Sequence, residues 1–347
     1  MKQIKFKDFK IIPILDSLKR VDMSDEEYFS KKYANYVSNS RLKNIDPTRG
    51  GSPEQYKNPP HFSTQSLAIG SVVHLQTLQK DEFEFLPKMG KPSAKLGLCL
   101  DYIIKYRKQG YSILESIIKA SASADYYSGR LTNSIIKSII KKGLGYYLKA
   151  KDIDLSDGNI ILSDSDHDIA EACINSLASN REIMSKLHPE DVFGEKLPSY
   201  NEDAMFIDFC VVYKDKAKIL HYKMKIDNWT IDVDNKRLVL NDLKTTRDNP
   251  DYFMHPKTGH FHSFRYDCQG ALYMDVLKLY CMQQYGFNDN WTTEINFLAV
   301  KNNYPYNSKC CNMNNELYKR GKKLYEELLK RVAYYEIFGY DEIVEFV

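Results

Sequence analysis

Two aspartates and a lysine lie in the middle of this 347-residue sequence at a spacing that suits phosphodiester chemistry. Asp227 comes first, and Asp242 and Lys244 follow it, separated from each other by Leu243. Carboxylate oxygens are preferred ligands of Mg²⁺, whose bound waters can become nucleophiles. A neighbouring ammonium can position that water and offset charge in the transition state. The two carboxylates and the amine therefore form a candidate hydrolytic centre.

Strands joined by polar turns must place these residues together. Residues 204–213 and 217–227 are rich in apolar, aromatic and β-branched residues, and 213–216 forms a polar turn between them. A second polar turn at 232–236 leads into the strand that carries Asp242 and Lys244. Side chains two positions apart share a face, so these two point the same way. The alternative is an exposed Asp-x-Lys tripeptide at a strand end.

Four short motifs occur in one order along the chain. Residues 68–74 (AIGSVVH) contain a Gly-x-x-x-His pattern, and residues 225–227 (KID) a basic-x-Asp pattern. Residues 241–246 (NDLKTT) follow, and residues 266–273 (YDCQGALY) contain a Gln-x-x-x-Tyr pattern. This set resembles the PD-(D/E)xK nuclease superfamily, in particular its exonuclease VIII (RecE-like) branch, common in phages and prophages. The resemblance extends over roughly residues 35 to 340.

The resemblance implies an α/β fold: a restriction-endonuclease-like core, with a central mixed β-sheet flanked by helices, plus an N-terminal helical elaboration. It implies a Mg²⁺ site, with Mn²⁺ as a substitute, formed by Asp227, Asp242, the Leu243 backbone carbonyl and His74. Lys244 would position the hydrolytic water. Gln269 and Tyr273, four apart on one helical face, would orient DNA or Lys244.

Several of these residues have plainer alternatives. A histidine on an apolar helical face is often a hydrogen-bonded core residue, and Tyr273 is one of 26 tyrosines. Glu195 precedes the first strand where the family often carries an acid, but Glu190, Asp191 and Glu202 are nearby acids of equal standing. Asp232 and Asp234 fall in a turn, the usual place for solvated aspartates.

The net charge of +3 does not by itself indicate a nucleic-acid binder. The stretch from Lys105 to Lys151 is nevertheless basic, with few acids. Lys137, Lys141 and Lys142 in that stretch, together with Lys225, are predicted to contact DNA phosphates. The alternative for the three clustered lysines is a solvated amphipathic helix.

Composition narrows the remaining possibilities. A hydrophobic content of 43% indicates a globular chain, and no run of 18 apolar residues or signal-peptide core occurs. We therefore expect no membrane association and a cytoplasmic location, in a bacterial host cell if the gene belongs to a phage. Seven cysteines without Cys-x-x-Cys spacing predict neither disulfides nor structural zinc, and the adjacent pair Cys310-Cys311 does not match the iron–sulfur branches of the superfamily.

The order of elements is expected to be helix, then sheet, then helix. We predict a helical part over 1–190 and a catalytic core over 191–347, as one continuous globular unit. Residues 1–60 look loosely organised, and helices are expected at about 64–80, 97–121, 125–150 and 165–187. The sheet is expected at 193–246, followed by a helix to about 285, a strand at 294–301 and a helix at 315–335.

The branch also implies partners. They are the ends of linear duplex DNA, digested 5′ to 3′ in phage-type recombination, and a single-strand annealing protein. It further implies a ring-shaped homo-oligomer. Two alternatives stay open: an endonuclease or single-strand nuclease of the same fold, and a non-catalytic DNA-binding protein that kept the fold.

Overall fold

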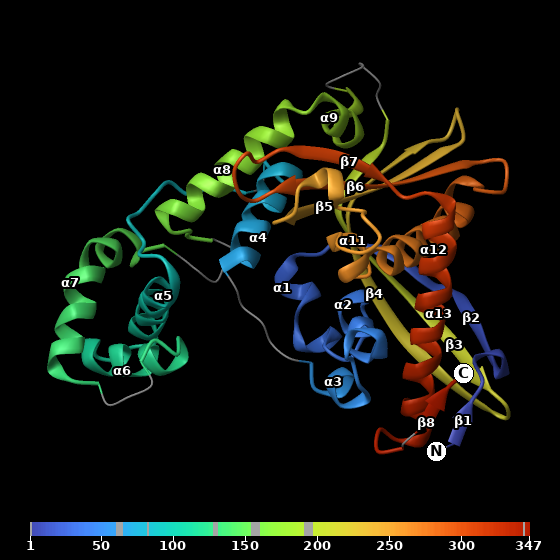
Figure 1. Ribbon diagram of the computed structural model, residues 1–347, viewed down its shortest axis with the longest axis horizontal. Coiled ribbons are helices and arrows are strands. Elements are labelled where there is room, and N and C mark those ends of the chain that lie inside the picture. Colours follow the sequence, from blue (N-terminus) through green and yellow to red (C-terminus); the bar gives the residue numbers. More distant parts are fainter. Residues whose placement is uncertain are drawn as a thin grey trace. The chain divides into compact units, whose positions relative to one another are not determined.

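The computed structural model describes residues 2–59, 65–81, 83–127, 131–153, 160–190, 197–342 and 344–347. The chain divides into two compact units. The first, the sheet unit, comprises residues 1–62 and 176–347, and the second, the helical unit, comprises residues 63–175. The expected class is confirmed: a mixed α/β fold whose six-stranded sheet is flanked by helices (Figure 1).

The central sheet has the strand order β2-β3-β4-β5-β6-β7, and only the β5–β6 pair is parallel. Helix α12 (Tyr266–Tyr285) connects these two parallel strands, as a parallel pair requires a crossover. A short parallel pair joins the ends of the chain, β1 (Lys2–Ile4) and β8 (Val344–Phe346). The six strands are β2 (Phe9–Val21), β3 (Ser199–Tyr213), β4 (Lys216–Asp232), β5 (Arg237–Thr246), β6 (Thr292–Lys301) and β7 (Ser308–Asn312).

The sheet forks between β4 and β5. Their antiparallel ladder runs from the turn as far as the pair Asn228↔Asn241 and ends there. Beyond this point β4 continues beside β3, while β5 continues beside β6. Asp227 and Asp242 are the first residues past the last pair, so both acids lie at the fork.

A row of asparagines crosses five strands immediately before the fork. Asn201, Asn228, Asn241, Asn296 and Asn312 occupy consecutive register positions on β3 to β7. Each amide donates to or accepts from its neighbour, at nitrogen–oxygen distances of 2.7, 2.7, 3.0 and 3.2 Å. The three central side chains are completely buried. This asparagine ladder satisfies its own polar groups inside the sheet and fixes the pairing of the strands.

Helices cover both faces of the sheet. On the ladder's face, Asn241 donates to the Lys186 carbonyl of α9 (Arg181–Leu187), and Lys186 pairs with Glu294 at 2.5 Å. The other face packs against α12 and α13 (Asn315–Phe338), which lie against each other (Figure 1). Consecutive side chains of a strand point to opposite faces, so the acids next to the ladder face α12.

The expectation that residues 1–60 are loosely organised is wrong. Strand β2 pairs with β3 along the edge of the sheet, where Pro13 is tolerated because an edge strand has a side without ladder partners. Val37 then forms a parallel bridge with Tyr222, in the part of β4 that does not pair with β5. The short elements that follow one another here are α1 (Asp25–Tyr28), η2 (Lys31–Tyr33), α2 (Asn39–Leu42), η3 (Lys43–Ile45), η4 (Pro47–Arg49) and α3 (Pro53–Lys57), and η1 (Phe6–Asp8) precedes β2.

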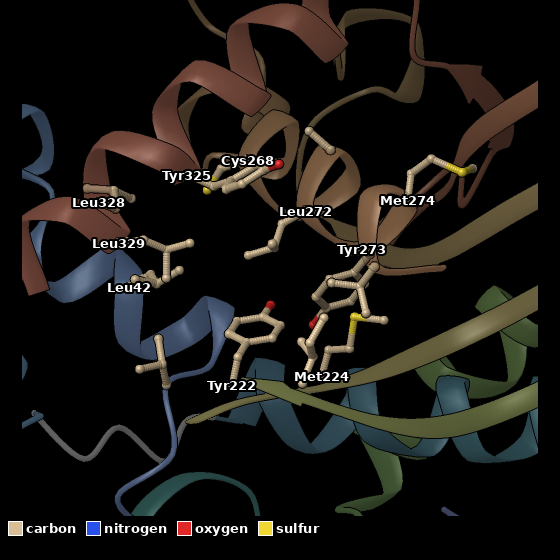
Figure 2. Packing of buried hydrophobic residues seen from close by; sticks show 14 of the residues in the cluster. Leu42, Tyr222, Met224, Cys268, Leu272, Tyr273, Met274, Tyr325, Leu328 and Leu329 are labelled. Carbon is tan, nitrogen blue, oxygen red and sulfur yellow. The ribbon is translucent and has the colours of Figure 1, made fainter. Parts of the chain in front are cut away.

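This N-terminal segment belongs to the main hydrophobic core. Leu42 is buried in the same cluster as Tyr222 of β4 and Leu272 of α12 (Figure 2). Ile45 is buried in this cluster as well. Gly51 permits the tight return of the chain, since a Cβ there would lie 2.6 Å from the Asn44 carbonyl oxygen. The predicted boundary at residue 190 therefore differs from the observed units, because the first 62 residues pack with the sheet.

The helical unit has a core of its own around Ile103, Ile117 and Tyr146. The expected helix at 97–121 is two helices, because Ser112 and Glu115 form a capping box that starts a new helix after Gly110. The expected helix at 165–187 also divides, at the N-cap residue Asn180. The helices are α4 (Gln65–Leu78), α5 (Ala94–Lys108), α6 (Ile113–Ser123), α7 (Asn133–Ala150) and α8 (Asp164–Ser179), whose last turn lies in the sheet unit.

The remaining short elements lie after β5, where η5 (Pro250–Tyr252) and α11 (His260–Ser263) lead into α12. Strand β7 forms the edge of the sheet opposite β2, and the sequence did not predict it. Among the described residues, none of the helices combines the length and the apolar character that a membrane crossing needs.

We predict that Asn241→Leu lowers the free energy of unfolding by about 3 kcal/mol. The substitution leaves the buried side-chain oxygen of Asn228 without a donor and the buried side-chain nitrogen of Asn296 without an acceptor. Each such unpaired group costs about 1–3 kcal/mol. Urea unfolding of the purified protein measures the change. Asn290→Leu, at an exposed turn position, is the matched control, and equal midpoints for the two variants would contradict the proposed weight of the ladder.

Candidate active site

The fork brings the predicted acids and lysine together. The Lys244 Nζ lies 2.5 Å from Asp242 Oδ2 and 3.8 Å from Asp227 Oδ2. All three side chains are largely buried, with exposed fractions of 15% for Lys244, 4% for Asp242 and 14% for Asp227. Two carboxylates from separate strands therefore converge on one ammonium.

The Leu243 peptide links the two arms of the fork. Its N–H donates to Asp227 Oδ2 at 2.7 Å, and its carbonyl oxygen accepts from Lys244 Nζ at 3.2 Å. Because β4 and β5 no longer pair here, the Leu243 N–H uses a carboxylate in place of a backbone acceptor. The Leu243 carbonyl, predicted as a metal ligand, thus faces the same ammonium as the acids.

Gln269 supports Asp242 from the first turns of α12. Its amide nitrogen donates to Asp242 Oδ1 at 2.6 Å, and its amide oxygen accepts from Asn39 Nδ2 at 3.1 Å. The sequence placed Gln269 at the site but assigned it to DNA or Lys244, whereas in the structure it holds the carboxylate. Asn39, on α2, is a supporting residue that the motifs did not indicate.

Tyr273 lies one helical turn beyond Gln269 and packs into the core. It is 8% exposed and lies in the hydrophobic cluster with Tyr222 and Met224 of β4 (Figure 2). Burial raises the pKa of its phenol well above the ordinary value, so it stays protonated. In the described part of the chain it makes no hydrogen bond to Lys244, and its predicted orienting role remains a prediction.

Glu202 joins the site from β3. A carboxylate oxygen of Glu202 lies within 4.8 Å of one of Asp227, and the two residues face each other across the β3–β4 hairpin. Glu202 has a positive φ of 49°, which a non-glycine residue rarely adopts and which marks a local distortion of the strand. The sequence could have predicted this position. If the strands pair on both sides of the turn at 213–216, counting residues away from the turn along each strand places Glu202 opposite Asp227.

Lys225 balances the charge of Glu202. Its ammonium lies 2.9 Å from Glu202 Oε2 and also pairs with Asp25 of α1. Burial lowers the pKa of Lys225, whereas the two carboxylates raise it, and the net effect is a rise. The ammonium of Lys225 is directed to protein carboxylates, and its contact with DNA phosphates stays a prediction.

The charge state of Lys244 follows from the same geometry. Burial alone would lower the pKa of its ammonium, but Asp242 and Asp227 raise it above the ordinary value. Lys244 is therefore protonated at neutral pH and acts as a hydrogen-bond donor. It can orient a water or a phosphate oxygen, whereas removal of a proton from the water needs another acceptor.

The donor set fits a hard divalent cation. Asp227 and Asp242 direct carboxylate oxygens to one point, now faced by an ammonium, and the Leu243 carbonyl adds a third oxygen at that point. Oxygen donors of this kind suit Mg²⁺ or Mn²⁺. Glu202, next to Asp227, supplies a further carboxylate that the sequence did not single out.

The other predicted residues belong to elements other than the fork strands or lie outside the described residues. His74 is on α4 of the helical unit and is half-buried, and its part as a metal ligand stays a prediction. Glu195 lies outside the described residues. The predicted DNA-binding lysines of the helical unit are exposed on α7, a helix that contains no acidic residue; they are Lys137, Lys141 and Lys142.

Tyr266 lies beside the ammonium groups of two lysines. The Tyr266 ring, at the start of α12, has its centroid 5.2 Å from Lys244 Nζ and 5.0 Å from Lys43 Nζ. Burial raises the pKa of the Tyr266 phenol. No motif in the sequence indicated Lys43, because it reaches the site only through the packing of the N-terminal segment.

Residues 54–336 match the family described as a PDDEXK-like domain of unknown function (DUF3799). No curated protein matches the chain. Among solved structures, a candidate exonuclease from Eubacterium rectale is similar, with 11% identity over 90% of this chain and 85% of that chain and a TM-score of 0.46. Protein VC1899 from Vibrio cholerae has 9% identity, a TM-score of 0.15, and coverage of 81% of this chain and 58% of that chain.

We predict that Gln269→Ala weakens Mg²⁺ binding about 10-fold or more, since groups that hold a metal-binding carboxylate typically contribute 10- to 100-fold in affinity. The variant loses the hydrogen bond that fixes Asp242 Oδ1. Isothermal titration of the folded variant with Mg²⁺ gives the affinity. Gln284→Ala, an exposed glutamine on the same helix, should bind as the wild type does, and equal affinities for both variants would remove Gln269 from this role.

Proposed function

Because this chain belongs to the PDDEXK-like family, we propose that it is a metal-dependent deoxyribonuclease that hydrolyses phosphodiester bonds. The observation that carries the proposal is the convergence of Asp227 and Asp242, from two strands, on the ammonium of Lys244. A site with paired carboxylates, one lysine and a supporting glutamine provides what phosphodiester hydrolysis needs.

Each residue of the site has a task in this proposal. Asp227, Asp242 and the Leu243 carbonyl would hold Mg²⁺, for which Mn²⁺ can substitute, and His74 or Glu202 would complete or support the set. When bound, the cation supplies a nucleophilic water and neutralises phosphate charge. Lys244 donates hydrogen bonds to the attacking water or to a phosphate oxygen, and Gln269 keeps Asp242 in its orientation.

The finer assignment is an exonuclease that acts on the ends of linear duplex DNA, with 5′ to 3′ polarity, in phage-type recombination. A single-strand annealing protein and a ring-shaped homo-oligomer belong to the same assignment, as does a cytoplasmic location. The sequence resemblance to the exonuclease VIII branch supports these points, since its motifs lie in the order found here. The alternatives are an endonuclease or single-strand nuclease of this fold, or a DNA-binding protein without activity.

We predict that Asp242→Ala abolishes Mg²⁺-dependent release of nucleotides from end-labelled linear duplex DNA, because it removes a hard oxygen ligand. Lys244→Ala should retain metal binding but lower the rate by about 10²-fold or more, the usual effect of losing one transition-state donor. Circular dichroism shows whether the variants are folded, and Asp289→Ala, at an exposed turn, is the matched control.

The same assay separates the alternatives. An exonuclease degrades the linear duplex and spares a covalently closed circle of the same sequence, whereas an endonuclease cuts both. Duplex binding without any release of nucleotides in Mg²⁺ or Mn²⁺ would establish the non-catalytic alternative. Full activity of Asp242→Ala would remove the fork from catalysis.

We predict that replacing Lys137, Lys141 and Lys142 by glutamine weakens duplex binding and its dependence on salt. Each lost phosphate contact lowers the slope of log affinity against log salt by about 1. Binding is measured in Ca²⁺ by fluorescence anisotropy over a range of salt concentrations. Replacing three exposed lysines of the sheet unit, Lys5, Lys10 and Lys214, should leave the slope unchanged, and equal slopes for both triple variants would make α7 a merely solvated helix.

A further inference from the structure

A second lysine shares the aromatic ring beside Lys244. The Nζ of Lys43 lies 5.0 Å from the centroid of the Tyr266 ring, and that of Lys244 lies 5.2 Å from the same centroid. A ring attracts cations to its face, but it cannot cancel a full charge. The site therefore contains two ammonium groups close to one tyrosine.

The two ammonium groups differ in their counter-ions. Lys244 is paired with Asp242 and Asp227. Within the described parts of the chain, Lys43 has no carboxylate in ion-pair distance, and its ammonium lies over the Tyr266 ring. Its position is nevertheless fixed, because Leu42 and Ile45 on either side of it are buried in the core.

The segment that carries Lys43 is also tied to α12. Asp46 is 1% exposed, pairs with Arg265 Nε at 3.2 Å and accepts from Thr48 Oγ1 at 2.6 Å. Arg265 is the N-cap residue of α12, and Tyr266 is the first residue of that helix. Lys43 and Tyr266 are therefore held together from both sides, so the place of the ammonium is set by packing.

The surroundings of Lys43 disfavour its charged form. Burial is the largest cause and lowers the pKa of its ammonium to about 8, with Lys244 and Arg49 acting in the same direction. Cys268, the second-largest cause, and Asp242 act in the other direction. An ammonium in such a place gains stability from an anion, and the ligand that a phosphodiesterase site admits is itself an anion.

We propose that Lys43 is a substrate-binding residue that contacts the phosphate of the phosphodiester group under attack, as a second cation beside Lys244. The inference rests on the proposed nuclease function. Lys244 is committed to the two aspartates, so Lys43 supplies the positive charge that is not already balanced by protein carboxylates. Its hydrogen bonds to the phosphate oxygens would strengthen as negative charge develops.

Three variants test the inference: Lys43→Met, Lys43→Arg and, as a matched control, Lys10→Met. Lys10 is exposed on the edge strand β2, near the end of the β3–β4 hairpin. With linear duplex DNA and Mg²⁺, Lys43→Met should lower kcat/KM by about 10²-fold, the usual effect of losing one charged donor. Lys43→Arg should recover most of that loss, and Lys10→Met should match the wild type.

The pH profile supplies a readout that a packing role would not change. In the wild type, kcat/KM should fall as the pH rises above about 8, since the Lys43 ammonium then loses its proton. The groups that face it from β5 and α12 do not titrate there. Burial raises the pKa of Cys268 to about 12 and also raises the pKa of the Tyr266 phenol, and the pKa of Lys244 lies above its ordinary value. Lys43→Arg should abolish this alkaline fall.

The outcomes separate the two proposals. A wild type that cleaves, together with a Lys43→Met rate equal to that of Lys10→Met, overturns the inference and leaves the nuclease function intact. If circular dichroism finds Lys43→Met unfolded, the pH profile of Lys43→Arg is the test. An alkaline fall of kcat/KM in Lys43→Arg like that of the wild type would show that Lys43 serves only in packing, and would overturn the inference. A wild type that releases no nucleotides overturns both.

Discussion

The register of the central sheet is the constraint on which the site depends. The asparagine ladder, Asn201 to Asn312, lies one residue away from the acids on β3, β4 and β5. A slip of one residue in any of these pairings would send an acid to the opposite face of the sheet, away from α12. A mispaired ladder would also leave buried amides without partners, which is costly. The same register slips that would separate the carboxylates are therefore destabilised by the unpaired amides.

The fork turns that register into a site. In an unbroken antiparallel sheet, Asp227 and Asp242 would be adjacent on a flat surface, with their backbone groups used in the ladder. Because the ladder ends at Asn228 and Asn241, the Leu243 N–H is directed to a carboxylate instead. The N-terminal segment then packs beside β4, which brings Asn39 to Gln269 and Lys43 to Tyr266. The same break in pairing therefore creates the cluster and recruits its supporting residues.

Much of this arrangement could be predicted from local sequence. Two polar turns fix the hairpin registers, so Asp242 opposite Asp227 follows from counting, and Glu202 opposite Asp227 would have followed too. Strand β2 could not be recognised, since its residues show no clean alternation between buried and exposed positions and it contains Pro13. Lys43 and Asn39 are beyond local reasoning, because they reach the site through a single bridge at Val37 and through core packing far from the motifs. The motif predicted Gln269 as a site residue, but only its hydrogen bond to Asp242 shows which group it holds.

The lysines near this fork differ in their counter-ions. Glu202 is offset by Lys225, and Asp227 and Asp242 are offset by Lys244. A divalent cation and the Lys244 ammonium need the same carboxylate oxygens, so their occupancy of the acids is competitive, and the ammonium is available to a phosphate only when the acids have another counter-ion. Lys43 has no such competitor among the described residues, and its place beside Tyr266 does not depend on the state of the acids. If the proposed function holds, a phosphodiester at the fork meets two cations. Lys244 is available to it only when the acids have another counter-ion, whereas the position of Lys43 is fixed by the packing of Leu42 and Ile45.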